Sequence, residues 1–195
     1  DMLKSRLFEK FPTAKIESEE SVGPAIGDYL KKSAWKLAIM AVIMMTLYLA
    51  FRFEFKYSVG AMTALLHDVI LSVGFCGAMG IEIDIPVIAA LLTLYGYSVN
   101  DTIVVFDRIK ETNELKGKLI FSEVVNKAIT QTLSRTIITA LTTLFAVFAL
   151  FFLGGEVLHN FATVLLFGLV IGTYSSIFIA SPVVYWWDIW RANKK

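Results

Sequence analysis

Five long apolar stretches, separated by short polar segments, constrain this chain more than any other feature. They cover residues 34–51, 57–80, 85–106, about 132–153 and 161–187. A helix needs roughly 20 residues to cross a hydrocarbon core about 30 Å thick, and each stretch is close to or above that length. A soluble fold of 195 residues has too little interior to cover all five. We therefore predict an all-α integral membrane protein with five transmembrane helices.

The composition supports this class and excludes several others. Hydrophobic residues make up 56% of the chain and charged residues only 18%, which is too apolar for a disordered or ordinary soluble protein. The net charge of +1 gives no sign of nucleic-acid binding. Cys76 is the single cysteine, and no His or Cys cluster has zinc-ligand spacing. We expect no metal and no cofactor.

The distribution of basic residues predicts the topology. Two of the segments between predicted spans, residues 81–84 and 154–160, lie on one side of the membrane and carry acids but no Lys or Arg. The positive-inside rule then predicts a cytoplasmic C-terminus and an external, water-exposed segment over residues 1–32. Ten basic residues fall on the side assigned to the cytoplasm: Arg52, Lys56, Arg108, Lys110, Lys116, Lys118, Lys127, Arg191, Lys194 and Lys195.

Two carboxylic acids lie deep within the predicted spans. Asp68 is about 16 Å along its helix from Tyr57, near mid-membrane, and Asp101 is about 10 Å from the Arg108 edge of its helix. A charge at the centre of a membrane helix costs about 2.5 to 3.5 kcal/mol. Each acid must therefore be neutralised, paired or hydrated, and each is a candidate functional residue. The alternative for both is a structural hydrogen-bonding role.

The residues around Asp101 recur at helical spacing. We expect an inward-facing strip that consists of Thr93, Tyr97, Asp101 and Val105. On the fourth stretch a second strip comprises Arg135, Thr139, Thr142 and Thr143. Arg135 enters from the same side as Asp101 at a comparable depth, so we predict that it pairs with that carboxylate, with an interfacial arginine as the alternative.

An Asp101–Arg135 pair would suit a proton carrier. Burial favours the neutral form of a carboxyl group, whereas a nearby guanidinium favours the charged form. Arginine itself stays protonated. A small displacement of either helix could therefore switch Asp101 between proton acceptor and proton donor.

Small residues predict close helix packing. They are Gly74, Gly77 and Gly80 in the second span, and Gly168 with Gly172 in the fifth. Pro182 is expected to kink the last helix near its end.

Several motifs resemble the SecF branch of the SecD/SecF family of protein-export membrane proteins, relatives of the resistance-nodulation-division transporters. The resemblance covers nearly the whole chain. A long block from Gly96 to Ile109, which includes Asn100-Asp101-Thr102 and Phe106-Asp107-Arg108, is the most specific part. The other motifs are Ser21-Val22-Gly23-Pro24, Phe51-Arg52-Phe53-Glu54, Leu66-His67-Asp68-Val69, Gln131-Thr132-Leu133-Ser134-Arg135-Thr136 and Ser175-Ser176.

The resemblance implies a function in protein export. It predicts a subunit of an auxiliary of the SecYEG translocon in the bacterial cytoplasmic membrane, driven by the proton motive force, with SecD, SecYEG, the translocating polypeptide and membrane lipid as partners. The coupling ion would be the proton. Asp101 resembles the proton-carrying acid and Arg135 its basic partner. Supporting polar roles fall to His67, Asp68, Asn100 and Thr102.

The chain departs from the family at its N-terminal end. Family members normally begin with another transmembrane helix followed by a small external domain. We therefore expect residues 1–32 to be the end of that external domain, a short remnant, and residues 33–195 to form a five-helix bundle of the resistance-nodulation-division type.

Three other functions stay open from the sequence. The chain could be a half-unit of a related proton-driven exporter of small molecules or lipids, or a structural scaffold. An intramembrane aspartyl protease could use Asp68 and Asp101 together. Neither acid has the Gly-x-Gly-Asp setting of those proteases, so we predict that the chain is not an enzyme.

Overall fold

The structure, a computed structural model, describes residues 24–115 and 120–194. Residues 1–23, which include Ser21-Val22-Gly23 and most of the expected external segment, lie outside the described residues. Throughout the described part the chain is helical, without strands, as predicted. The elements are α2 (Pro24–Arg52), α3 (Phe55–Met79), α4 (Ile85–Leu115), α5 (Phe121–Leu153), α6 (Gly155–Ser175), a short π-helix η1 (Ser176–Ala180) and α7 (Ser181–Ala192).

Five helical segments of the described chain are long and apolar enough to cross a membrane. The fifth combines α6, η1 and α7 into one continuous segment. The five predicted spans are therefore confirmed, but four of the helices begin earlier than predicted: α2 at Pro24, α3 at Phe55, α5 at Phe121 and α6 at Gly155. Helix α5 has 33 residues and is about 50 Å long, which exceeds the hydrocarbon thickness. Its amphipathic start continues the helix beyond the apolar stretch that marked the span.

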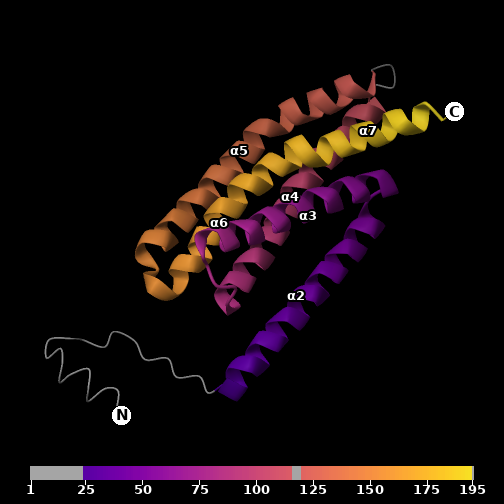
Figure 1. Ribbon diagram of the computed structural model, residues 1–195. Helices are drawn as coiled ribbons and strands as arrows, with labels where there is room; N and C mark the ends of the chain where they lie inside the picture. The colour runs from indigo at the N-terminus through magenta and orange to yellow at the C-terminus, as the bar shows by residue number, and fades with distance from the viewer. Residues whose placement is uncertain (1–23, 116–119, 195) are drawn as a thin grey trace, which may run out of the picture.

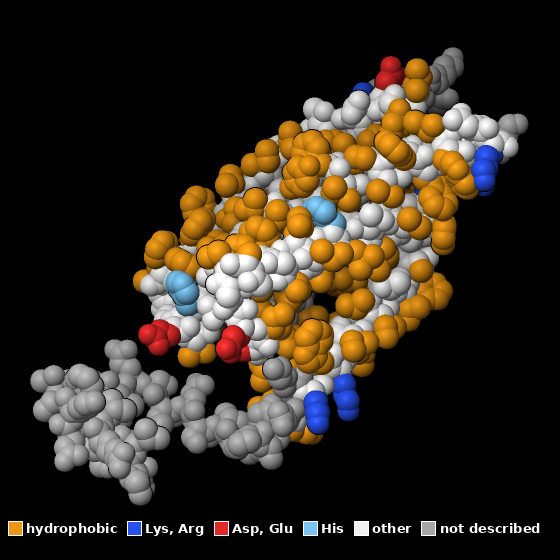
Figure 2. Space-filling view, in the orientation of Figure 1, with side chains coloured by type: hydrophobic (Ala, Val, Ile, Leu, Met, Phe, Trp, Pro, Cys, Tyr) orange, Lys and Arg blue, Asp and Glu red, His pale blue; other side chains and the backbone are white. Residues whose placement is uncertain are grey.

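The helices form a bundle centred on α3, α4 and α6, as Figure 1 shows. Helix α5 lies along α6 and α4 on one side. Helix α2 leans away from the bundle over most of its length and meets it near Arg52. Figure 2 shows hydrophobic side chains over the body of the molecule, with acidic and basic side chains gathered near its ends. This distribution suits a lipid-facing surface.

The end of α2 is anchored by one apolar and one ionic contact. Leu49 and Phe53 are buried in the core. Beside them the Arg52 guanidinium donates to both carboxylate oxygens of Asp107 on α4, at 2.9 and 2.8 Å. The Lys110 ammonium lies 5.3 Å from the centre of the Phe53 ring, a cation–π distance. The α2–α3 corner is thereby attached to α4 at Asp107.

The turn between α3 and α4 fixes the relative register of the two acid-bearing helices. Gly80 has φ +67°, a left-handed conformation that ends α3 and that residues with a side chain rarely adopt. Asp84 then caps α4, because its side-chain oxygen accepts the Val87 N–H at 2.9 Å. The connection is consequently short and fixed at both ends.

Glycines bring α4 and α6 close together, as predicted for the Gly168–Gly172 pair. A Cβ atom on Gly168 would lie 2.5 Å from Leu94 Cδ2, and one on Gly172 would lie 3.3 Å from Ser98 Cβ. A Cβ atom on Gly74, Gly77 or Gly80 would meet no neighbouring atom of the described chain within 4 Å. The packing prediction is therefore wrong for these three glycines within the described residues.

The irregularity expected from Pro182 is a π-helical turn. Proline has no backbone N–H and cannot donate to the carbonyl four residues earlier. The residues just before it adopt the π-helix η1, with hydrogen bonds between residues five apart. The turn begins at Ser176, the second residue of the Ser175-Ser176 motif.

Substitution of Gly168 by Ala tests the α4–α6 contact. The new methyl group would overlap Leu94, which is fully buried, so we expect a loss of about 1 to 3 kcal/mol of stability. Thermal unfolding of the purified protein in detergent measures this change. Gly74→Ala is the matched control, since its methyl group meets no described atom, and equal stability of the two variants would contradict the packing.

Candidate functional site

A layer of polar side chains crosses the centre of the bundle between two apolar clusters. On α3 the buried apolar residues end at Leu65 and resume at Cys76, and on α6 they end at Leu169 and resume at Ala180 in η1. Because both clusters are apolar, the polar groups between them must satisfy one another. The buried polar residues of this layer are Asp68, Ser72, Ser98, Thr102, Ser175 and Ser176.

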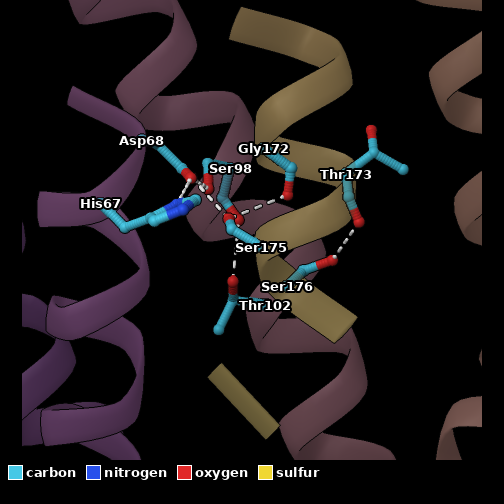
Figure 3. Close-up of polar contacts among 8 residues, drawn as sticks. All are labelled: His67, Asp68, Ser98, Thr102, Gly172, Thr173, Ser175 and Ser176. Carbon is cyan, nitrogen blue, oxygen red and sulfur yellow. Dashed lines mark hydrogen bonds and ion pairs between the residues drawn. The ribbon is translucent and has the colours of Figure 1, made fainter. Parts of the chain in front are cut away.

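Asp68 lies at the centre of this layer and accepts hydrogen bonds from two other helices (Figure 3). Its side chain is 1% exposed. Its Oδ2 atom accepts from Ser98 Oγ of α4 at 2.6 Å and from Ser175 Oγ of α6 at 2.7 Å. Its Oδ1 atom lies 3.0 Å from Nδ1 of the half-buried His67. Both carboxyl oxygens are therefore in hydrogen bonds.

Asp101 has a similar arrangement with different helices. Its Oδ1 atom accepts from Thr136 Oγ1 of α5 at 2.6 Å, and its Oδ2 atom accepts from Ser176 Oγ of η1 at 2.5 Å. The Asp101 side chain is half-buried, whereas Thr136 is buried. The carboxyl group thus links α4 to both neighbouring helices.

The predicted pair of Asp101 and Arg135 does not form. Arg135 is exposed on α5 and has no ion pair or hydrogen bond within the described chain. The next residue, Thr136, takes the position at Asp101 instead. Successive helical residues point about 100° apart, so a helix that presents Thr136 inward turns Arg135 outward. Within this chain, the prediction that Arg135 contacts Asp101 is therefore wrong.

The inward strip predicted on α4 is confirmed at Val105, which is buried, and in part at Tyr97 and Asp101, which are half-buried. Thr93 and Asn100 are exposed, while Leu94, Ser98 and Thr102 are buried. The hydroxyl group of Thr102 donates to the Ser98 carbonyl of its own helix at 3.0 Å. Thr102 is therefore well placed to support the layer, and Asn100 points away from it.

The hydroxyl partners are the part of the site that sequence reasoning missed. Ser98, Thr136, Ser175 and Ser176 carry no charge, and although all four lie within the quoted motifs, none of them was predicted to bond to an acid. The available signal was the presence of two adjacent serines inside an apolar helix.

These hydroxyl groups allow either carboxyl group to exist with or without a proton. A serine hydroxyl can donate a hydrogen bond and accept one. Ser175 Oγ also lies 3.2 Å from the Gly172 carbonyl, and Ser176 Oγ lies 3.1 Å from the Thr173 carbonyl. If the carboxyl group gains a proton, the serine can accept from it and donate to its own helix. Neither form leaves a buried polar group unpaired.

Comparisons with known proteins place these features in one family. Residues 2–190 match the family described as protein export membrane protein SecD/SecF, C-terminal. The chain is 43% identical to protein translocase subunit SecF of Endomicrobium trichonymphae over 100% of this chain and 63% of that protein. It is 48% identical to protein translocase subunit SecF of Thermodesulfovibrio yellowstonii, over 93% of this chain and 60% of the relative.

A fused relative and a solved structure agree with this assignment. Protein translocase subunit SecDF of Thermus thermophilus is 46% identical over 93% of this chain and 25% of its own length. A crystal structure of SecDF in a super-membrane-facing form has a TM-score of 0.85 and 44% identity, covering 99% of this chain and 26% of that one. This chain thus spans less than two thirds of each of these relatives.

Replacement of Ser98 by Ala tests the hydrogen bonding at Asp68. The variant keeps the Cβ contact with Gly172 but removes one donor to a buried carboxyl group, so we expect a loss of about 1 to 3 kcal/mol. Thermal unfolding in detergent provides the measurement. Thr132→Val is the control, because this buried hydroxyl bonds only to carbonyls of its own helix. A Ser98→Ala variant no less stable than the control would refute the role.

Proposed function

The chain belongs to the SecD/SecF family of protein-export membrane proteins, and from this premise we propose that it acts as a SecF-like subunit of an auxiliary of the Sec translocon. In this role the proton motive force drives the subunit to promote polypeptide export across the cytoplasmic membrane. The relatives named protein translocase subunit SecF and SecDF support the proposal. Because the chain corresponds to only part of each relative, the activity is proposed for the complete complex.

The observation that carries the proposal is the setting of Asp101. Its two carboxyl oxygens are held by hydroxyl groups from α5 and from η1, in a segment long and apolar enough to cross a membrane. A carboxyl group in that position is costly when charged and unpaired. With these hydroxyl partners it can take up a proton and release it while its hydrogen bonds rearrange.

Proton uptake at Asp101 would act on helix positions. The charged carboxylate accepts from Thr136 and Ser176 and so draws α5 and η1 toward α4. Protonation removes the charge that strengthens both hydrogen bonds. A proton that crosses the whole membrane releases about 2.3 kcal/mol per 100 mV, which is enough to bias such a rearrangement when access alternates between the two sides.

Arg135 is proposed to act at the contact with a partner subunit. It is a permanently charged side chain on the outer face of a helix long and apolar enough to span the membrane, and no acid of the described chain pairs with it. Such a residue requires a carboxylate, a water-filled path or the lipid headgroup region. The SecDF fusion of Thermus thermophilus supports SecD as the partner subunit, and we propose that SecD supplies the carboxylate.

Other partners and the orientation follow from the same proposal. Family membership and five apolar helices make the chain a multi-pass protein of the bacterial inner membrane. We place the N-terminal side outside and the C-terminus in the cytoplasm, in line with the basic residues. SecYEG and the translocating polypeptide are the proposed partners beyond SecD, with membrane lipid around the helices.

The geometry argues against a protease. The two carboxyl groups bond to different serines, and no hydrogen bond joins them within the described chain. An aspartyl protease needs two carboxyl groups that share one proton. We therefore propose that the chain contributes motion and no catalysed reaction.

Asp101→Asn is the direct test of the proposal. The amide keeps the size of the side chain but cannot carry a proton, so the full-length protein should still assemble with SecD and lose the proton-dependent stimulation of export. Export into membrane vesicles, with and without a proton gradient, measures the effect. Asp84→Asn is the matched control on the same helix, since asparagine also caps a helix. Undiminished stimulation by Asp101→Asn would disprove the proposal.

Arg135→Gln separates an interface role from a role inside this chain. Because the side chain is exposed and unpaired within the described residues, we expect the stability of the isolated protein to change by less than about 0.5 kcal/mol. Recovery of SecD with the full-length variant and proton-dependent export should both fall. Arg191→Gln, an exposed arginine near the C-terminus, is the control. A marked loss of stability in the isolated Arg135→Gln protein, with SecD binding intact, would contradict the interface.

A further inference from the structure

Two consecutive serines at one helix junction bond to the two acids, the buried Asp68 and the half-buried Asp101. Ser175 is the last residue of α6 and donates to Asp68 of α3, and Ser176 is the first residue of η1 and donates to Asp101 of α4. Figure 3 shows both serines, with Asp68 and His67 reaching toward Ser175. Successive residues of a helix point about 100° apart, so a single junction can face α3 and α4 at once.

Each of these serines has a second acceptor on its own helix. The alternatives are the Gly172 carbonyl for Ser175, at 3.2 Å, and the Thr173 carbonyl for Ser176, at 3.1 Å. A hydroxyl group has one hydrogen and can donate it well to one acceptor at a time. The protonation state of each carboxyl group therefore decides which way its serine points.

The junction itself is a π-helical turn. Such turns are rare, occur mostly as single turns inside α-helices and are frequent at functional sites. Here Ser181 Oγ donates to the Ser176 carbonyl at 3.2 Å, across the turn. The irregular backbone thus begins at the residues that hold the two acids.

One more hydroxyl group lies on the same face of α3 as Asp68. Ser72 lies one turn further along α3, is fully buried, and its Oγ atom has no hydrogen-bond partner in the described chain. Buried hydroxyl groups are normally bonded. Within the described chain the polar layer therefore contains a buried hydroxyl group without a partner, on the same face of α3 as Asp68.

We propose that Asp68 is a second proton-binding carboxyl group of the transport cycle, and that the Ser175–Ser176 pair couples its protonation to that of Asp101. The inference rests on the proposed function for the role of Asp101. Within the described chain, the groups bonded to Asp68 are the titratable His67 of α3, Ser98 of α4 and Ser175 of α6.

The corresponding groups at Asp101 come from three elements. Thr136 of α5 and Ser176 of η1 bond to the carboxyl oxygens, and Tyr97 of α4 is the titratable group close enough to interact electrostatically. Arg135 faces away. Within the described chain the two acids therefore share no charged partner. The serine pair joins them through one helix junction, in addition to α4, which carries both Asp101 and the Ser98 that bonds to Asp68.

The coupled step needs only a proton. A proton from water binds Asp68 Oδ2 and makes the carboxyl group neutral. The new O–H donates to Ser175 Oγ, and the Ser175 hydrogen turns to the Gly172 carbonyl. The Ser175–Ser176 junction then keeps only the hydrogen bond from Ser176 to the charged Asp101. The free energy of protonating Asp101 therefore differs from its value when Asp68 is charged. Release of either proton to water reverses the change.

Infrared titration of the full-length protein in complex with SecD tests the inference. The carboxyl bands of Asp68 and Asp101 are assigned by their loss in Asp68→Asn and Asp101→Asn. We expect Asp68→Asn to change the proton affinity of Asp101 roughly fivefold or more, and Asp101→Asn to change that of Asp68 by about the same factor, because coupling between two sites is reciprocal. Ser175→Ala keeps both acids and should reduce the coupling.

Thr132→Val is the matched control, because this buried hydroxyl group lies outside the serine junction and bonds only to carbonyls of its own helix. An Asp68 band with one protonation state throughout the titration, or unchanged Asp101 affinity in Asp68→Asn, would overturn the inference. Full coupling in Ser175→Ala would overturn the role of the serine pair. The titration does not depend on export, so loss of export in Asp101→Asn with uncoupled titrations would contradict this inference and leave the proposed function standing.

Discussion

Hydrogen bonds from hydroxyl groups to buried carboxyl groups hold the centre of this bundle together. The apolar clusters on either side of the polar layer do not by themselves fix the helices relative to one another, because lipid is as apolar as their side chains. Asp68 fixes α3 to α4 and α6, and Asp101 fixes α4 to α5 and η1. The same bonds depend on the charge of each acid, so the interaction that defines the packing is also the one that a proton can alter.

Much of the fold could be predicted from the sequence because membrane insertion depends on the length of apolar stretches. The five spans and the two deep acids follow from that rule, and the Gly168–Gly172 contact follows from residue size. The start of α5 at Phe121 could not be predicted in the same way, since polar residues at the amphipathic beginning continue the helix outside the apolar stretch. Pro182 predicts an irregular backbone just before it, but the residues around it do not predict that this irregularity is a π-helix.

The partners of the acids were harder to predict than the acids themselves. Opposite charge favoured Arg135 for Asp101, but the rotation of α5 presents Thr136 instead, and one residue along a helix is enough to reverse the outcome. Uncharged hydroxyl groups give a weak sequence signal, and so Ser98, Ser175 and Ser176 were not predicted as ligands. Arg135 has no acidic partner among the residues that the structure describes, and the contact that we propose for it is with a partner subunit.

We propose that Asp101 binds and releases protons as the bundle rearranges. This proposal is tested by the charge movement in the full-length complex with SecD, adsorbed on a supported membrane and exposed to a rapid pH change. We predict a transient current in the native complex that is absent in Asp101→Asn while assembly with SecD is retained. An equal current in both proteins would show that the moving charge is carried elsewhere and would contradict the account.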